Sequence, residues 1–165
     1  MFFVISSIII VLLIISDQIS KLYIVNNFKI FESIPIIERY IHITYVQNPG
    51  AAFGILQNKQ MFFIITTSIV ICMLLIYLFK SNNKSMYLLV SLILIVSGGI
   101  GNLIDRVRLS YVVDFIDIRL SNIIPLLKTD WPVFNFADSY IVVGSIILCY
   151  YIIFKYDKEV ENIEK

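Results

Sequence analysis

The sequence is poor in charged residues, and this shortage excludes several classes of protein. Only 15% of its 165 residues are charged, whereas 59% are hydrophobic; soluble domains average about 25% charged and about 45–50% apolar residues. An ordinary soluble domain is therefore excluded, and so is a disordered chain, which needs low hydrophobicity and high charge. Thirteen Lys and Arg balance twelve Asp and Glu, so no basic excess favours a nucleic-acid partner.

Histidine and cysteine are also scarce. The one histidine, His42, argues against a zinc site, and no His-Glu-x-x-His sequence occurs. A Ser-His-Asp triad would need His42, and no serine lies in a nucleophile-elbow sequence. We expect His42 at a surface position of a strand. Cys72 and Cys149 fall inside apolar segments, where we expect buried thiols that behave as small hydrophobic side chains.

What the sequence has instead is four long runs without a charge. They cover residues 1–16, 60–79, 85–104 and 139–154. About 20 helical residues cross a hydrocarbon core of about 30 Å. The first run has neither a preceding Lys or Arg nor a small-x-small cleavage site, so we expect a retained helix. We predict an all-α integral membrane protein, a single domain over 1–165, with helices at about 2–25, 60–79, 85–104 and 136–155.

The topology follows from the order of these spans, which alternate in direction. Loops 26–59 and 105–135 then share one side of the membrane, and the turn 80–84 and tail 156–165 share the other. Lysines in the turn and tail favour a cytoplasmic location for them, although the two long loops hold more Lys and Arg in total. We expect both termini in the cytoplasm and both long loops outside it.

The first long loop has its own local structure. Residues 41–46 are β-branched and partly alternating, which predicts a strand, and residues 28–37 supply a second strand of a small sheet at the membrane surface. Asn48-Pro49-Gly50 follows with turn chemistry. A plain turn into the second helix is the simpler explanation for these three residues taken alone.

Acidic and amide side chains recur where the second long loop meets the helices. Asn102 and Asp105 share a helix face, and Asn135 and Asp138 repeat the Asn-x-x-Asp spacing. Asp114 lies between apolar residues near helix ends, where an acid is costly unless it is paired or used. These acids are therefore the candidates for chemistry.

Each acid also has a simpler structural role open to it. Asp138 suits the N-cap of the last helix, and Asp105 suits an ion pair with Arg106. Asp17 and Lys21 lie one helical turn apart and suit another pair.

Paired carboxylates are the best remaining means of catalysis in a chain without a zinc motif or triad. Two close Asp side chains share a proton, because both cannot ionise. One then activates a water while the other protonates the substrate carbonyl. This is peptide hydrolysis of the aspartic-protease kind. Asp117 and Asp130 are expected to be solvated loop acids.

Five motifs in this order resemble those of the lipoprotein signal peptidases, the type II signal peptidases of bacteria. They are Asp17-Gln18-Ile19-Ser20-Lys21, Asn48-Pro49-Gly50-Ala51-Ala52-Phe53-Gly54, Gly101-Asn102-Leu103-Ile104-Asp105-Arg106, Val112-Val113-Asp114-Phe115 and Phe134-Asn135-Phe136-Ala137-Asp138-Ser139. The resemblance covers residues 10–155. Ser20 stands where the family usually has Thr, and the stretch 119–132 is longer than is typical.

The resemblance implies four transmembrane helices with a small extracytoplasmic β-sheet and a loop helix. It implies a monomeric aspartic endopeptidase of the bacterial cytoplasmic (inner) membrane, with its active site at the extracytoplasmic face. Such an enzyme removes signal peptides from diacylglyceryl-modified prolipoproteins and cleaves before the lipidated cysteine. Its partners are this lipid-modified substrate and membrane lipids, and it needs no metal or organic cofactor.

By the same resemblance Asp114 and Asp138 are the catalytic pair, with Asp105 as the rival partner of Asp138. The supporting or substrate-binding residues are Asp17, Lys21, Asn48, Gly50, Asn102, Asp105, Arg106 and Asn135. The alternative function is a small proton- or ion-coupled membrane transport protein. It is less favoured, because a proton relay needs ionisable groups at mid-span, and the second and third runs contain none.

Overall fold

Four long helices run side by side in the computed structural model, which describes residues 2–50, 59–80, 85–122 and 130–156. They are α1 (Phe2–Asn27), α2 (Gln60–Lys80), α3 (Met86–Leu109) and α4 (Phe136–Phe154). Each is long and apolar enough to cross a membrane, which confirms the four predicted spans. Helix α3 continues past the expected end at residue 104, and this extension carries Asp105 and Arg106 within the helix.

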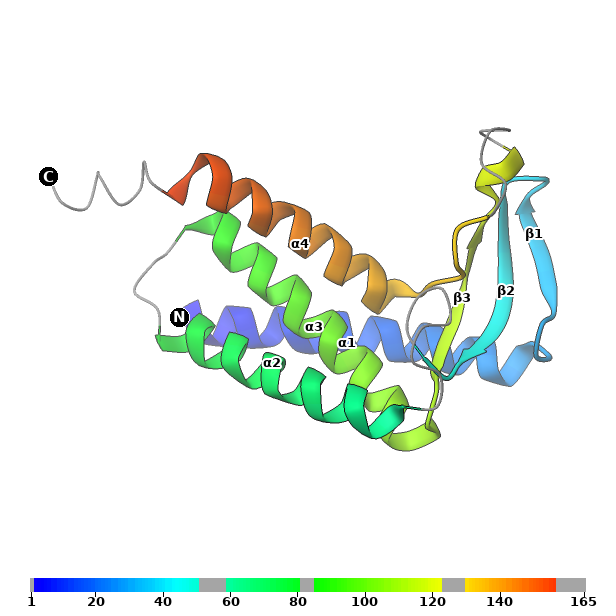
Figure 1. The fold of residues 1–165 in the computed structure, drawn as a ribbon, viewed down its shortest axis with the longest axis horizontal. Helices are drawn as coiled ribbons and strands as arrows, with labels where there is room; N and C mark the ends of the chain where they lie inside the picture. The colour runs from blue at the N-terminus through cyan, green and yellow to red at the C-terminus, as the bar shows by residue number, and fades with distance from the viewer. Residues whose placement is uncertain (1, 51–58, 81–84, 123–129, 157–165) are drawn as a thin grey trace, which may run out of the picture.

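Helix α3 lies at the centre of the bundle, and α1, α2 and α4 pack around it (Figure 1). Three of its glycines each face a different neighbour. A Cβ on Gly98 would strike the backbone of Ala137 in α4, one on Gly99 would meet Ile71 of α2, and one on Gly101 would strike Asp17 of α1. Small residues at these contacts allow the backbones to approach closely, as is usual between membrane helices.

The two cysteines are exposed, in α2 and α4, so the expectation that they are buried was wrong. Both helices carry apolar side chains on their outer faces as well as on their packed faces. Lipid is as apolar as the interior of a bundle. Hydropathy therefore does not separate the two faces of a membrane helix.

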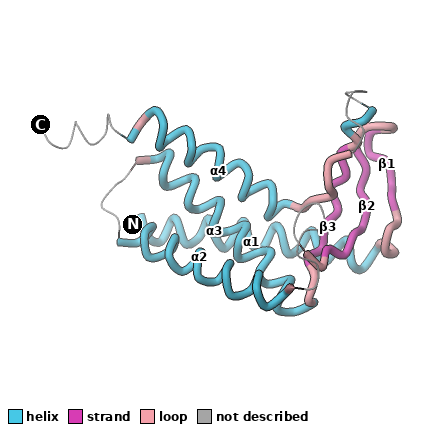
Figure 2. Tube along the Cα trace, viewed as in Figure 1, coloured by secondary structure: helices cyan, strands magenta, loops and turns pink. Residues whose placement is uncertain are grey.

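A three-stranded antiparallel sheet lies at one end of the bundle, in the order β1 (Ser33–Ile37), β2 (Ile41–Asn48) and β3 (Val112–Ile118) (Figures 1 and 2). It confirms the predicted sheet and adds the strand β3, which the sequence analysis did not identify. Ile24 near the end of α1 packs against Tyr45, Val113 and Phe115. This apolar cluster fixes the sheet to the bundle.

Two polar residues of the sheet are less exposed than expected. His42 is only 8% exposed. The carboxylate of Asp117 accepts a hydrogen bond from Thr44 at 2.8 Å and pairs with Arg119 at 3.6 Å. Both expectations of a surface position were wrong, because β2 and β3 bring these side chains together across the sheet. Asp130 is exposed, as expected, and accepts a hydrogen bond from the backbone of Ser121 at 2.9 Å.

The helical structure that the described loop residues contain is one short 3₁₀ turn, Leu120–Asn122. Residues 51–58 and 123–129 lie outside the described residues. They include the end of the second motif and the middle of the long stretch 119–132. The predicted loop helix is therefore matched, in the part of the loops that the structure describes, by this turn alone.

Candidate active site

Side chains from five elements meet where the sheet joins the bundle. Asn48 ends β2, Asp114 lies on β3, and Asn102 lies near the end of α3. Asn135 is the N-cap of α4, and Asp138 is its third residue. Lys21 of α1 joins the same cluster by donating a hydrogen bond to Asn102. Residues that are up to 117 positions apart, from 21 to 138, are thus brought into one hydrogen-bonded network.

The start of α4 is organised by a capping box. The Asn135 side chain accepts a hydrogen bond from the backbone N–H of Asp138 at 2.9 Å, and the Asp138 carboxylate accepts one from the backbone N–H of Asn135 at 3.3 Å. Such reciprocal bonds satisfy the free N–H groups at a helix start. The N-cap is therefore Asn135, and the simpler role considered for Asp138 was wrong in detail.

Asn135 also bridges the two acids. Its side-chain amide donates to Asp114 Oδ1 at 2.7 Å and to Asn102 Oδ1 at 3.1 Å. The residue is fully buried, with no exposed surface. The Asn135 side-chain NH₂ therefore holds Asp114, while the Asn135 backbone N–H and side-chain oxygen hold Asp138.

A further side-chain amide donates a hydrogen bond to each carboxylate. Asn48 Nδ2 donates to Asp114 Oδ2 at 2.9 Å, and Asn102 Nδ2 donates to Asp138 Oδ1 at 2.7 Å. Asn48 is itself fixed, because its carbonyl oxygen accepts the backbone N–H of Gly50 at 3.0 Å. Among the described residues, both acids are thus held by neutral amides rather than by direct contact with a cation.

Lys21 supports this arrangement from the interior of the bundle. Its ammonium group, on a residue only 2% exposed, lies 2.9 Å from Asp17, 3.0 Å from Asp105 and 2.9 Å from Asn102 Oδ1. A cation on Oδ1 fixes the orientation of the Asn102 amide, so that its Nδ2 faces Asp138. The pair of Asp17 with Lys21 is formed as the spacing predicts.

Asp105 is bound beside Asp17 rather than to Asp114 or Asp138. Its Oδ1 accepts a hydrogen bond from Gln18 at 3.0 Å, and its Oδ2 accepts one from the backbone N–H of Val113 at 3.1 Å besides the ion pair with Lys21. The ion pair considered for Asp105 and Arg106 is replaced by this one. Gln18 is a supporting residue that the sequence analysis missed, although it belongs to the first motif.

Arg106 contacts a different set of neighbours. Its guanidinium lies 5.0 Å from the ring centroid of Phe63 and donates to the backbone carbonyl of Gly50 at 3.3 Å. Its Nε is buried and has no hydrogen-bond partner among the described residues.

A cavity of about 580 Å³ opens in front of the two acids, within the usual size range of ligand pockets. Its polar wall is formed by Asn48, Asn102, Arg106, Asp114, Asp138 and Ser139. The remaining wall is mostly apolar and consists of Thr67, Gly99, Val112, Trp131, Pro132, Val133, Phe134, Ile141, Val142 and Val143. No pattern in the sequence indicated Trp131 or its neighbours as part of a cavity. An apolar pocket with two carboxylates at one wall suits hydrolysis of a peptide with apolar flanks.

The environment changes the acidity of Asp114. Burial, and after it the nearby carboxylate of Asp138, raises the pKa of Asp114 to about 7, against the opposing effect of hydrogen bonds from Asn48 and Asn135. This carboxyl therefore retains its proton in a large share of molecules near neutral pH.

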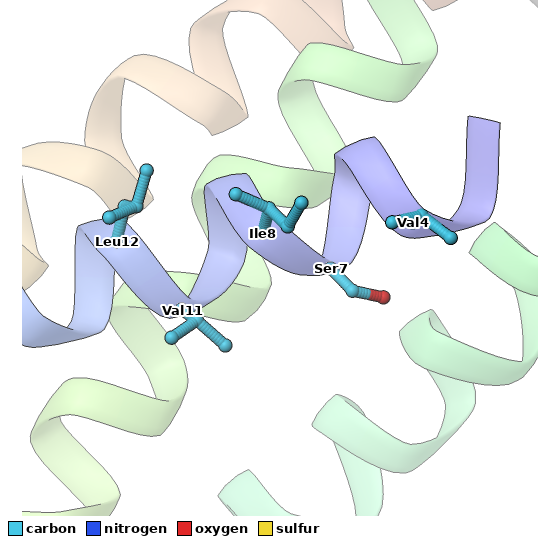
Figure 3. A pocket seen from close by; sticks show the side chains of 5 residues that line it. All are labelled: Val4, Ser7, Ile8, Val11 and Leu12. Carbon is cyan, nitrogen blue, oxygen red and sulfur yellow. The ribbon is translucent and has the colours of Figure 1, made fainter. Parts of the chain in front are cut away.

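Another hollow lies on the outer face of α1 and is formed by Val4, Ser7, Ile8, Val11 and Leu12 (Figure 3). Ser7 is the one polar side chain among these five, and none of them is titratable, so this hollow offers no catalytic group. Among the residues that the structure describes, no three His, Cys, Asp or Glu side chains are grouped so as to hold a metal ion.

Comparison with known proteins gives a consistent result. The family model for signal peptidase (SPase) II matches residues 9–154. A lipoprotein signal peptidase of Clostridioides difficile is 45% identical over 149 residues, which cover 88% of this chain and 93% of that protein. One of Moorella thermoacetica is 44% identical over 135 residues, which cover 81% and 83%.

Two solved structures, both described as bacterial membrane enzymes, share the fold. The first has a TM-score of 0.81 at 36% identity and covers 89% of this chain and 86% of its own. The second has a TM-score of 0.79 at 35% identity and covers 91% and 93%. The likeness therefore extends through the helices and the sheet.

Proposed function

The chain belongs to the signal peptidase II family, and we propose that Asp114 and Asp138 are the carboxylates with which it works. It is a multi-pass protein of the bacterial inner membrane and an endopeptidase that removes signal peptides from prolipoproteins. The observation that carries the proposal is the bridge through Asn135, which holds both acids beside one cavity. The transport alternative is not supported, because the matching family is a peptidase family.

The different surroundings of Asp114 and Asp138 give the two acids different roles. Asp138 lies in the first turn of α4, where the helix dipole favours a negative charge, so it is the general base. Asp114, whose pKa is raised to about 7, carries the shared proton. Asp105 is the weaker partner, because it is ion-paired with Lys21 and, unlike Asp114 and Asp138, is not among the residues that line the cavity.

The reaction then runs as an acid–base exchange between the pair. Asp138 removes a proton from a water molecule, and the oxygen of this water bonds to the scissile carbonyl carbon. At the same time Asp114 gives its proton to the carbonyl oxygen. The tetrahedral diol collapses as the C–N bond breaks. Asp138 returns its proton to the departing amine, and Asp114 recovers one from the diol hydroxyl. The pair ends in its starting protonation state, so no metal or cofactor is required.

The remaining site residues hold the substrate or the acids. Arg106 lines the cavity, where its guanidinium donates to the backbone carbonyls of a bound peptide, and Gly50 keeps the Arg106 side chain in place through its carbonyl. Asn102 and Asn48 hold the acids and support the developing charge on the carbonyl oxygen. Asp17 and Lys21 fix the position of Asn102 from behind.

We further propose that the sheet end of the molecule faces outward. The C-terminal end of α2 lies away from the sheet (Figure 1) and carries Lys80, so the positive-inside rule assigns that side to the cytoplasm. The substrate is a diacylglyceryl-modified prolipoprotein, cleaved before its lipidated cysteine, and its acyl chains stay in the lipid. The enzyme acts as a monomer in the membrane.

The proposal is tested with purified protein and two forms of one prolipoprotein, with and without the diacylglyceryl group, each with and without a chelator. We expect cleavage before the cysteine of the lipid-modified form alone, unchanged by the chelator. Equal cleavage of the unmodified form would contradict the substrate assignment, and loss of activity on chelation would contradict the dyad mechanism.

A further inference from the structure

A shallow hollow lies on the outer face of α2, near the end of that helix that points away from the sheet (Figure 1). This α2 hollow measures about 440 Å³ and is lined by Met73, Ile76, Tyr77 and Lys80. The last three residues follow Met73 by three, four and seven positions, so all four share one face of the helix. At about 1.5 Å per residue, the hollow follows the helix for about 10 Å. It shares no residue with the cavity beside Asp114.

The lining changes in character along the helix. Met73 and Ile76 are apolar and exposed, Tyr77 adds a hydroxyl group, and Lys80 is the last residue of α2. A lysine at the end of a membrane helix extends its ammonium group to the interface, while its methylene stem stays in the apolar layer. The α2 hollow therefore combines an apolar strip with one positive charge at its end, and it fits an amphiphile with a negative head.

The described part of the protein does not balance the charge of Lys80. Its ammonium group forms no ion pair with a described residue. The described acidic residues lie in the sheet, in its loops or in the halves of α1, α3 and α4 nearest to it, and the other four acids follow residue 156, outside the described residues. Lys155, at the same end of the bundle, differs because its Nζ lies 5.7 Å from the ring centroid of Tyr87.

We propose that the α2 hollow binds one anionic phospholipid from the membrane leaflet at the end of the bundle away from the sheet. The phosphate contacts Lys80, with the hydroxyl of Tyr77 as a further donor, and the first part of an acyl chain lies against Met73 and Ile76. A strip of about 10 Å fits within one leaflet, whose share of the hydrocarbon core is about 15 Å. This site goes beyond the proposed function, because it lies at the opposite end of the bundle from the two acids.

The negative charge of the lipid is what selects it. Basic side chains at a membrane surface attract lipids that carry a net negative charge. A zwitterionic phospholipid brings its own cation beside the phosphate and gains less from Lys80. Both kinds of lipid gain equally from the apolar strip, so the preference for the anionic one measures the contribution of Lys80.

Lys155 and Met61 provide matched controls. Lys155 carries the same charge at the same end of the bundle but does not line the α2 hollow. Met61 lies at the other end of the same helix and is 67% exposed, against 56% for Met73. The first control separates a bound lipid from the general attraction between a lysine and an anionic membrane. The second separates the hollow from exposed apolar surface in general.

The test titrates the purified full-length chain, in a neutral detergent, with dioleoyl phosphatidylglycerol or dioleoyl phosphatidylcholine, and native mass spectrometry counts the bound lipids. We expect the first phosphatidylglycerol to bind at least about fivefold more tightly than phosphatidylcholine, which is the scale of one lysine at an anionic surface. Lys80→Gln should abolish this preference, and Lys155→Gln should leave most of it. Met73→Trp fills the apolar strip and should weaken the binding of phosphatidylglycerol about fivefold, on the scale of one or two methylene groups that lose their contacts. Met61→Trp should not weaken it.

A phosphatidylglycerol with a diazirine in one acyl chain locates the site. In phosphatidylcholine vesicles that contain the protein, photolysis should label residues 73–80, and an excess of unmodified phosphatidylglycerol should suppress this labelling.

Four results would each overturn the inference. They are equal binding of the two lipids by the unsubstituted chain, equal losses in Lys80→Gln and Lys155→Gln, unchanged binding in Met73→Trp, and labelling confined to other segments. The first result is also the one expected if the four acids that follow residue 156 occupy Lys80 in place of a lipid.

Discussion

The side-chain amide of Asn135 lies 2.7 Å from a carboxylate oxygen of Asp114, a residue 21 positions earlier in the chain. The same amide group reaches Asn102, and its carbonyl oxygen caps the first turn of α4. Asn135 thus couples the stability of a helix start to the geometry of the proposed catalytic pair.

Replacing Asn135 with Ala should affect both properties. The change removes a cap and leaves buried acceptors unpaired, so we expect a loss of about 1–3 kcal/mol in the free energy of unfolding. The kcat should fall by at least tenfold, because Asp114 and Asp138 lose their common support. The exposed Asn27, whose side chain donates a hydrogen bond to the backbone carbonyl of Tyr23, gives the control Asn27→Ala with unchanged kcat. Full activity in Asn135→Ala would contradict the bridging role.

Lys21 is predicted to be essential for stability. Lys21→Met leaves Asp17 and Asp105 as buried charges without their partner, and breaking such a pair costs about 3–5 kcal/mol. Chemical unfolding in detergent measures the loss, and Lys29→Met, at an exposed position, serves as the control. Neutralising both acids in the same variant should restore much of the stability. Activity should remain low even then, because the amide of Asn102 is no longer oriented.

The pH dependence of cleavage should report on Asp114. Its pKa is raised to about 7, and the mechanism needs its proton, so kcat/KM should decline as the pH rises through about 7. Steady-state kinetics from pH 5 to 9 check this. A rate that stays level to pH 9 would show that no proton on the pair is needed in this range.

The same shift predicts a stability effect of known sign. Between the ordinary pKa of 3.8 and about 7, Asp114 holds more proton in the folded protein than in the unfolded chain. The free energy of unfolding should therefore fall as pH rises across this interval. Asp114→Asn should flatten that part of the curve, and an unchanged slope would contradict the burial of the carboxyl.

Arg106 should act on substrate binding more than on chemistry. Lys at this position lacks the planar fork that contacts the carbonyl of Gly50 and the ring of Phe63. We expect Arg106→Lys to raise KM about tenfold with a smaller change in kcat, while Arg108→Lys, at an exposed site on the same helix, changes neither. A drop confined to kcat would instead assign Arg106 to the chemical step.

The sequence predicts the membrane helices well, because charges are so costly in lipid that their absence marks each span. The strand β3 escaped prediction because it is buried on both faces along most of its length, and its acids at 114 and 117 do not alternate with a period of two. His42 and Asp117 were misjudged for a related reason. Their neighbours come from other strands, and one such contact, from Thr44 to Asp117, joins residues 73 positions apart.

The site shows the same division between local and long-range information. The spacing of Asp17 and Lys21 within one helix is enough to predict their ion pair. The neighbouring sequence does not predict the partner of Asp105. Lys21, which lies on another helix, forms the ion pair that was considered for the adjacent Arg106. The apolar wall of the cavity is formed by packing of α2 and α4 around Gly99, which no motif records.

The most direct test of the central claim compares Asp114→Asn, Asp138→Asn and Asp105→Asn in cleavage of a purified diacylglyceryl-modified prolipoprotein, with folding verified by thermal unfolding. We predict that the first two variants fold and lose on the order of 10³-fold or more in kcat, whereas Asp105→Asn is less stable but retains measurable turnover. Near-parental cleavage by Asp114→Asn or Asp138→Asn would contradict the account.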